Sequence, residues 1–152
     1  MAPATEQGSQ VIVRKITEDD IEDVLAIDRG ITGNDRALTY TSAPNSYVGG
    51  ELGVSVVAEV DGKVVGFLLG QITDSPFGRS DTAMLILMGV DPGYRRRKIG
   101  SRLVKAFEGC CRQKGVTSVH VMVSWQDWWL LSFIKSMEFS LGEIAEFVKA
   151  VE

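Results

Sequence analysis

The stretch MGVDPGYRRRKIGSRL, residues 88–103, decides the fold because it runs from an apolar strand through a basic loop into a helix. Several backbone N–H groups at a helix start have no partner within the helix, and the aligned peptide dipoles place partial positive charge there. Four consecutive cations, Arg95 to Lys98, strengthen that field, and Gly100 would let the backbone approach a ligand because it has no Cβ. This segment therefore predicts a phosphate-binding loop.

Composition is typical of one compact domain that does not bind nucleic acid. The 152 residues are 45% hydrophobic, and we expect a single domain over 11–152 after a mobile tail over 1–10. A net charge of −4 opposes a general nucleic-acid surface, so the basic run is interpreted locally. Because no membrane-length apolar run or secretory-signal pattern is present, we expect a cytoplasmic protein that does not bind membranes. The adjacent Cys110 and Cys111 favour free thiols over a disulfide.

Hydrophobic periodicity and turn residues outline the elements around this loop. Asp61-Gly62 supplies the positive φ angles of a tight turn and predicts a hairpin. The expected strands cover 11–16, 54–60, 63–72, 83–90, 117–124, 139–141 and 145–151. The expected helices cover 98–114, 127–136, a stretch from Ile21 that ends at Asp28-Arg29-Gly30, and a short 35–40 within a long loop over 30–53. This order predicts an α+β (mixed α/β) sheet with helices on both faces.

Residues 95–100 resemble the signature of the GCN5-related N-acetyltransferase (GNAT) superfamily. That family has Arg or Gln, two residues, Gly, one residue, then Gly or Ala after its fourth strand; here Lys98 replaces the first glycine. The resemblance implies a GNAT-like, mostly antiparallel, twisted central sheet of 6–7 strands, with a splay between strands 4 and 5. It also implies acetyl-CoA as co-substrate and no metal. The cofactor-binding residues that it implies are Met88, Val90, Arg95, Arg96, Arg97, Lys98, Ile99, Gly100, Ser101 and Asp127.

The same resemblance implies where the pantetheine arm of the cofactor would lie. It would occupy the splay and pair with the main chains of Met88 and Val90, with Gly89 allowing a local bulge. The N–H of Met88 would be the oxyanion donor. In the helix after the fifth strand, Ile134 stands where the family often has a tyrosine that protonates the departing thiolate. A thiol with a pKa of about 8.5 leaves readily as the thiolate without such an acid.

The proton acceptor for an attacking amine is not marked by a family residue. The resemblance aligns Met84 and Met122 with two glutamates that serve this purpose, and neither methionine accepts a proton. His120 lies two residues before Met122 and has a reference pKa near 6.5 that suits a base, although a lone strand histidine is more often structural. Asp81 and Glu51 are further candidates, which would accept the proton through an ordered water molecule. The alternative is that both are ordinary surface carboxylates without a role in catalysis.

We interpret the chain as an acetyl-CoA-dependent N-acetyltransferase that transfers acetyl directly to a primary amine. The sequence is compatible with two classes of acetyl acceptor, a peptide or protein amine and a small amine. The alternative is an acyl-CoA-binding module with little or no catalysis, because Met84, Met122 and Ile134 occupy family chemistry positions. A nucleic-acid role for the basic run ranks third. Apolar late strands make a homodimer reasonable, and the three tryptophans at 125, 128 and 129 would serve core or dimer packing, or wall a channel.

Overall fold

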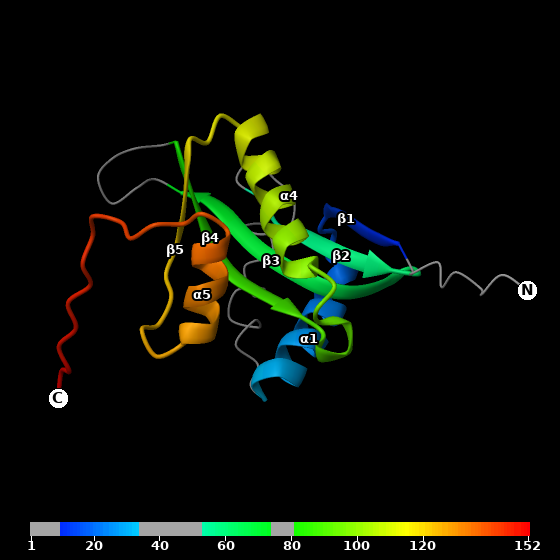
Figure 1. Ribbon diagram of the computed structural model, residues 1–152, viewed down its shortest axis with the longest axis horizontal. Coiled ribbons are helices and arrows are strands. Elements are labelled where there is room, and N and C mark those ends of the chain that lie inside the picture. The colour runs from blue at the N-terminus through cyan, green and yellow to red at the C-terminus, as the bar shows by residue number, and fades with distance from the viewer. Residues whose placement is uncertain (1–9, 34–52, 74–80) are drawn as a thin grey trace, which may run out of the picture. The chain divides into compact units, whose positions relative to one another are not determined.

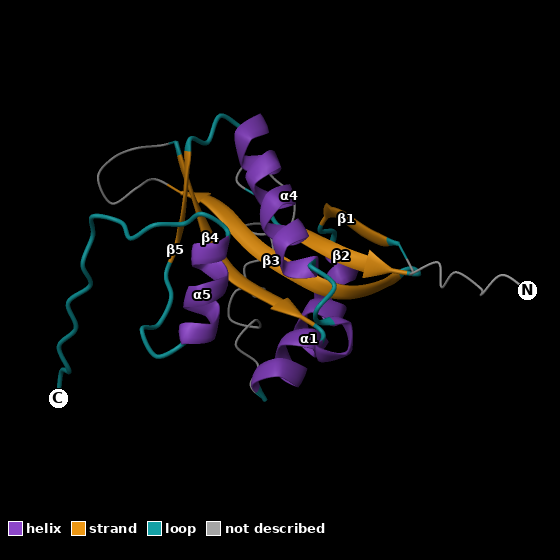
Figure 2. Ribbon diagram, in the orientation of Figure 1, coloured by secondary structure: helices purple, strands orange, loops and turns teal. Residues whose placement is uncertain are grey.

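The computed structural model describes residues 10–33, 53–73 and 81–152, so most of the expected tail over 1–10 and the short helix predicted at 35–40 lie outside the described residues. Figures 1 and 2 show the elements. In chain order they are β1 (Val11–Lys15), the 3-10 turn η1 (Glu18–Asp20), α1 (Ile21–Thr32), β2 (Val56–Val60), β3 (Lys63–Thr73), β4 (Thr82–Val90), the 3-10 turn η2 (Pro92–Tyr94), α4 (Ile99–Gln113), β5 (Ser118–Val121) and α5 (Trp128–Ser136). Met1–Met122 and Val123–Glu152 form two compact units.

The sheet has five strands in the order β1-β2-β3-β4-β5, and the described residues form no sixth or seventh strand. Three of its strand pairs are antiparallel, while β4 and β5 are parallel. The prediction of 6–7 strands was therefore wrong, because neither 139–141 nor 145–151 pairs with a strand. An apolar pattern favours an extended chain, but a strand also needs a neighbour that completes its hydrogen bonds. In the second unit, Phe147 and Val148 are instead exposed to solvent.

The β2–β3 hairpin forms around Asp61-Gly62, as predicted. Both turn residues have positive φ angles, 51° at Asp61 and 79° at Gly62, which match the right-handed twist of the strands that they join. Apart from the half-buried Ile72, the valines, leucines and phenylalanine of both strands are buried, including Val57 and Phe67. This hairpin therefore forms the centre of the core and carries the segments that follow.

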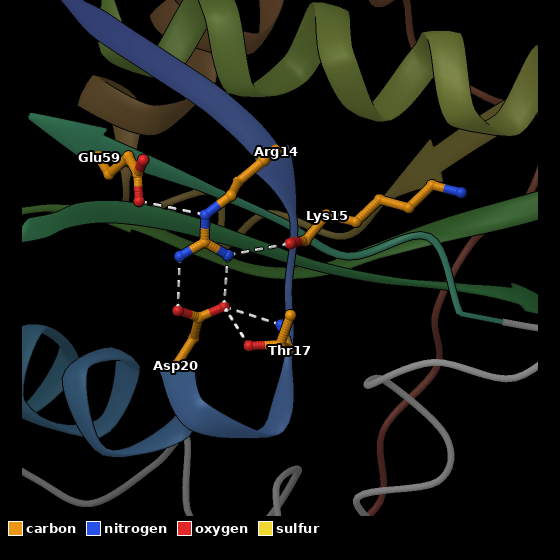
Figure 3. A network of polar contacts seen from close by, with 5 residues as sticks. All are labelled: Arg14, Lys15, Thr17, Asp20 and Glu59. Atoms are coloured by element: carbon orange, nitrogen blue, oxygen red, sulfur yellow. Dashed lines mark hydrogen bonds and ion pairs between the residues drawn. The ribbon is translucent and has the colours of Figure 1, made fainter. Parts of the chain in front are cut away.

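Helices cover both faces of the sheet, as predicted, because side chains alternate along β3. Phe67 and Leu69 join Val24 and Ile27 of α1 in one apolar cluster. The opposite face carries glycine at positions 66 and 70, where α4 approaches closely: a Cβ on Gly70 would lie 2.3 Å from the ring of Phe107. In Figure 3 the blue helix α1 and the yellow-green helix α4 lie on opposite sides of the strands.

Helix α1 runs past its predicted end at Asp28-Arg29-Gly30. It continues to Thr32, and Gly33 ends it with a φ of 72° and a 2.8 Å hydrogen bond from its N–H to the carbonyl of Arg29. A single glycine inside a helix costs only about 1 kcal/mol, whereas the left-handed terminal position favours glycine strongly. The second glycine, not the first, therefore ends the helix.

A polar network joins β1 and β2 to the start of α1 (Figure 3). The guanidinium of Arg14 donates two 2.8 Å hydrogen bonds to the buried carboxylate of Asp20 and one of 3.1 Å to Glu59. The backbone N–H of Thr17 also donates to Asp20, at 2.7 Å. The Arg14 side chain holds the pKa of Asp20 below its ordinary value. This charged pair links β1 to the turn that precedes α1.

Candidate cofactor-binding site

The loop from β4 to α4 is attached to β3 by backbone hydrogen bonds. The N–H of Asp91 donates to the carbonyl of Val65 at 2.8 Å, and the N–H of Tyr94 donates to the carbonyl of Asp91 at 2.9 Å. The carboxylate of Asp91 accepts a further 2.9 Å bond from the N–H of Gly93, which closes the 3-10 turn η2. The basic residues that follow thus leave the sheet from a fixed point.

Two non-glycine residues in the basic loop adopt left-handed backbone conformations. The φ angle is 67° at Arg96 and 58° at Lys98, and Lys98 occupies the N-cap position of α4 without a side-chain cap hydrogen bond. Lys98 therefore keeps a conformation that glycine adopts most easily, at the position where the family signature has its first glycine. The replacement seen in the sequence changes the side chain while the backbone still turns into the helix.

The uncapped start of α4 presents backbone donors beside exposed cations. The first intrahelical bond runs from the N–H of Arg102 to the carbonyl of Lys98, so the N–H groups at 99–101 precede the hydrogen-bond ladder of the helix. Ile99 is buried, and its Cγ2 would lie 3.2 Å from a Cβ on Gly66, which shows how closely the helix start approaches β3. The four cations at 95–98 are exposed. These groups fit a bound pyrophosphate, because donors and positive charge converge on one helix terminus.

An open strand edge lies next to this loop. The parallel pairing of β4 with β5 ends at Leu85 and Val121, while β4 continues to Val90. Within the described residues, no strand pairs with 86–90 on the β5 side. The peptide groups of that edge can accept an amide-containing arm as if it were an added strand. The splay between the fourth and fifth strands stays a prediction, and the end of their pairing at Leu85 and Val121 is its expected position.

The bulge in β4 lies at Ile86, and the expectation that Gly89 allows it was wrong. Leu69 pairs with Leu87 while Gly70 pairs with Leu85, so Ile86 is the extra residue. Gly89 serves packing instead, since a Cβ there would lie 2.9 Å from the side chains of Ile31 and Phe67. A glycine in a strand signals either a bulge or a close approach, and here the approach of α1 decides it.

The bulge also decides which face each β4 side chain occupies. Leu85 lies opposite Gly70 on the α4 face, whereas Leu87 belongs to the cluster on the α1 face. Met84 is consequently on the α1 face, and its parallel partner on β5 is His120. An unbroken strand would place Met84 and Met88 on one face, but the extra residue separates them.

The candidate proton acceptors differ in their surroundings. His120 is exposed, and its Nε2 lies 3.2 Å from the hydroxyl of Ser118 on the same face. Asp81 accepts a hydrogen bond from the hydroxyl of Thr117 through its carboxylate and a 2.9 Å bond from the Thr117 N–H through its carbonyl, so it joins the starts of β4 and β5. Glu51 lies outside the described residues. His120 is thus the candidate best placed beside Met84.

The second unit contains Asp127 and the three tryptophans. Asp127 caps α5, where its carboxylate accepts a 3.1 Å hydrogen bond from the N–H of Leu130. Trp125, Trp128 and Trp129 are exposed, so core packing within this unit does not explain them. Met122, the last residue of the first unit, follows β5 and is also exposed.

The two cysteines of α4 are free thiols, as predicted. Burial raises the pKa of the Cys111 thiol to about 12, so this thiol stays protonated near neutral pH. A protonated, buried thiol is a poor nucleophile. Cys111 therefore does not offer an acyl-enzyme route. No group of three or more His, Cys, Asp or Glu side chains that could hold a metal occurs among the described residues.

Comparison with known proteins identifies the family. The sequence profile of the acetyltransferase (GNAT) family matches residues 21–127, which is more than half of the chain. The chain belongs to this family. A relative, the L-2,4-diaminobutyric acid acetyltransferase of Nocardia farcinica, is 36% identical over 73 residues, a match that spans 47% of this chain and 36% of the relative's length. The matched segment thus covers about a third of that relative.

Solved structures support the same GNAT fold. The aminoglycoside N-acetyltransferase AAC(6')-Iy in complex with CoA superposes with a TM-score of 0.78 at 19% identity, over 95% of this chain and 97% of that one. The PaiA N-acetyltransferase of Thermoplasma acidophilum in complex with coenzyme A gives a TM-score of 0.69 at 18% identity, over 90% and 93%. GNAT enzymes use acetyl-CoA, and the loop, helix terminus and open β4 edge of this chain provide groups that fit it. No helix in the described part of the chain is long and apolar enough to span a membrane.

Proposed function

We propose that this chain is an acetyl-CoA-dependent N-acetyltransferase that transfers acetyl directly to a primary amine. The observation that carries the proposal is the uncapped N-terminus of α4, which follows the cationic loop and residues 86–90 of β4. Within the described residues, this end of β4 pairs with β3 but with no strand on the β5 side. Phosphate donors and an amide-binding strand edge are thereby joined in one continuous segment. A general anion site would need the phosphate donors but not the amide-binding strand edge.

Each part of the segment then has a role in holding the cofactor. The N–H groups at 99–101 bind the pyrophosphate, and the four cations at 95–98 neutralise the phosphates of the cofactor. The main chains of Met88 and Val90 pair with the pantetheine amides. When bound, acetyl-CoA supplies an activated thioester. The N–H of Met88 orients its carbonyl oxygen and stabilises negative charge that develops there.

His120 is the proposed proton acceptor. A lysine-like amine has a pKa of about 10.4, so it must lose a proton before or during attack at neutral pH. His120 pairs across the strands with Met84, and Met84 is the residue that the resemblance aligns with a glutamate. The hydroxyl of Ser118 lies within hydrogen-bond distance of the His120 ring. One proton of the ammonium passes to the imidazole and leaves the nitrogen neutral. The nitrogen then forms the new bond to the acetyl carbon as the C–S bond breaks, and its second proton is released with the departing CoA thiolate. Asp81 and Glu51 are the alternative acceptors.

The acceptor that the comparisons favour is a small primary amine. The Nocardia relative is named for a diamino acid, and several similar structures are named for aminoglycosides. A protein amine is the competing acceptor, since a ribosomal-protein-alanine N-acetyltransferase from Brucella melitensis shares the fold at a TM-score of 0.73. Because acetyl-CoA is an intracellular metabolite, we place the reaction in the cytoplasm.

Binding and turnover measurements test this function together. Calorimetry with acetyl-CoA is followed by thiol release against diamines, aminoglycosides and peptides. We expect micromolar binding and turnover with at least one small amine. His120→Gln should lower turnover but leave CoA affinity unchanged, and Lys15→Gln, on the exposed β1 position, is the matched control. An unchanged pH–rate profile in His120→Gln would remove the histidine as base. Tight cofactor binding without turnover of any amine would favour the acyl-CoA-binding module.

We also propose that the chain acts as a homodimer. The second unit exposes large apolar side chains after α5: Leu141, Ile144, Phe147, Val148 and Val151. Contiguous exposed apolar surface usually marks an interface. Light scattering should give twice the 16.6 kDa mass of one chain. Phe147→Asp should then produce a monomer, and a monomeric wild-type protein would end this proposal.

A further inference from the structure

Two cations from segments far apart in the sequence meet over one aromatic ring beside the cofactor loop. The Cζ atom of Arg97 lies 5.2 Å from the centroid of the Tyr94 ring, and the Nζ atom of Lys63 lies 5.8 Å from the same centroid. The ring is half-buried, whereas both cations are exposed. The quadrupole of an aromatic ring attracts cations, so Tyr94 holds the two side chains in one neighbourhood.

The backbone fixes this cluster in place. Tyr94 belongs to η2, whose preceding residue Asp91 is hydrogen-bonded to the carbonyl of Val65. Val65 lies two residues after Lys63 on β3, so this bond ties the loop to the strand that carries the lysine. The two cations are therefore brought together by tertiary structure and by a rigid strand, not by proximity along the chain.

The cluster is available to an anion. The two centroid distances place the cations no more than about 11 Å apart, close to one Debye length, so their fields overlap near the ring. Within residues 10–33, 53–73 and 81–152, neither Lys63 nor Arg97 forms a salt bridge with a carboxylate. Two unneutralised positive charges beside a flat ring favour a phosphate group over a neutral ligand.

We propose that Lys63 and Arg97, gathered on Tyr94, form a second anion subsite that takes the 3′-phosphate of CoA. The inference rests on the proposed function, in which the pyrophosphate binds at the N–H groups of 99–101. CoA carries one more phosphate, on the ribose beyond the pyrophosphate. Arg97 directly precedes the N-cap residue of α4, so the subsite adjoins the pyrophosphate position. The cluster thereby distinguishes CoA from analogues that lack the ribose phosphate.

Calorimetry on the full chain with CoA and with 3′-dephospho-CoA tests the subsite. The wild type should bind CoA more tightly, and Lys63→Gln should weaken CoA about three- to fivefold while leaving dephospho-CoA unchanged. Tyr94→Leu should lower the same selectivity, whereas Tyr94→Phe should retain it because the ring face remains. Lys15→Gln removes an exposed lysine from the far end of the β1–β2 ladder and should change neither affinity.

The outcomes separate this inference from the function on which it rests. Equal affinity of the wild type for both cofactors, or equal losses for both in Lys63→Gln, would overturn the subsite and leave the acetyltransferase proposal intact. Failure of the wild type to bind either cofactor would overturn the function itself. Lys63 is exposed at a hairpin end, so its variant should fold, and its result decides the question even where Tyr94→Leu is unstable.

Discussion

Replacing Lys98 with glycine should stabilise the protein and weaken cofactor binding at the same time. Lys98 has φ 58° and ψ 24°, a left-handed conformation that costs a residue with a Cβ about 1–2 kcal/mol. Glycine removes that strain, but its freer unfolded chain costs about 0.4–1 kcal/mol. The net gain is about 0.5–1 kcal/mol, which for a chain of this size raises the melting temperature by about 1–4 °C.

The same substitution removes a cation from the phosphate-binding loop. An exposed ion pair contributes about 0.2–1 kcal/mol, so CoA affinity should fall about 1.5- to fivefold at low salt and less at high salt. Lys98→Ala is the matched variant, because it loses the same charge but keeps the Cβ. Glycine and alanine variants should therefore bind CoA equally, while the glycine variant is about 1 kcal/mol more stable.

Thermal unfolding and calorimetry on the three proteins measure both effects. An alanine variant as stable as the glycine variant would show that the left-handed backbone at position 98 carries no strain. CoA binding as tight as that of the wild type in both variants, across the salt range, would show that the charge of Lys98 does not contribute to affinity. Either result is informative separately, because stability and affinity are measured on the same samples.

Three further predictions concern the scaffold. Asp20→Asn should lower the free energy of unfolding by about 1–3 kcal/mol at pH 7, because it removes the charged partner of Arg14. The pairing with Arg14 holds the pKa of Asp20 below its ordinary value of 3.8, so the wild-type advantage is complete above pH 3.8 and disappears as the pH falls through the lowered pKa. Urea unfolding at several pH values will measure this dependence. Gly70→Ala should destabilise by about 1–3 kcal/mol, because its Cβ would lie 2.3 Å from the ring of Phe107, and a neutral result would contradict the close approach of α4. Gly30→Ala should stabilise α1 by about 0.5–1 kcal/mol, since nothing lies within 4 Å of its added Cβ, and a lower melting temperature would contradict that open environment.

Local sequence patterns were sufficient for several elements of this fold. The Asp61-Gly62 turn, the hairpin and the amphipathic helix α4 follow the pattern because their determinants lie within a few residues of one another. The basic loop was likewise recognised from neighbouring residues. The candidate cofactor site and the candidate base His120 were both named from the sequence, but the pairing of His120 with Met84 was not predicted, because strand register depends on residues far apart in the chain.

Sequence patterns gave wrong predictions where the local structure depends on contacts with other parts of the chain. The apolar segment at 145–151 favours an extended chain, yet no described strand completes its hydrogen bonds. Gly30 carried a stop signal, but Gly33 lies at the position that needs a left-handed residue. Gly89 carried a bulge signal, but Ile86 is the extra residue and Gly89 admits α1.

By itself, the sequence determined that a strand, a basic loop and a helix follow one another, and this order predicts a phosphate-binding loop. Tertiary structure alone decided that His120 lies beside Met84, that Met88 turns to the other face, and that Lys63 reaches the ring of Tyr94. The physical reason is that helix starts and tight turns depend on backbone preferences of adjacent residues. Strand register, bulge position and contacts between distant side chains depend on pairings that no local pattern specifies.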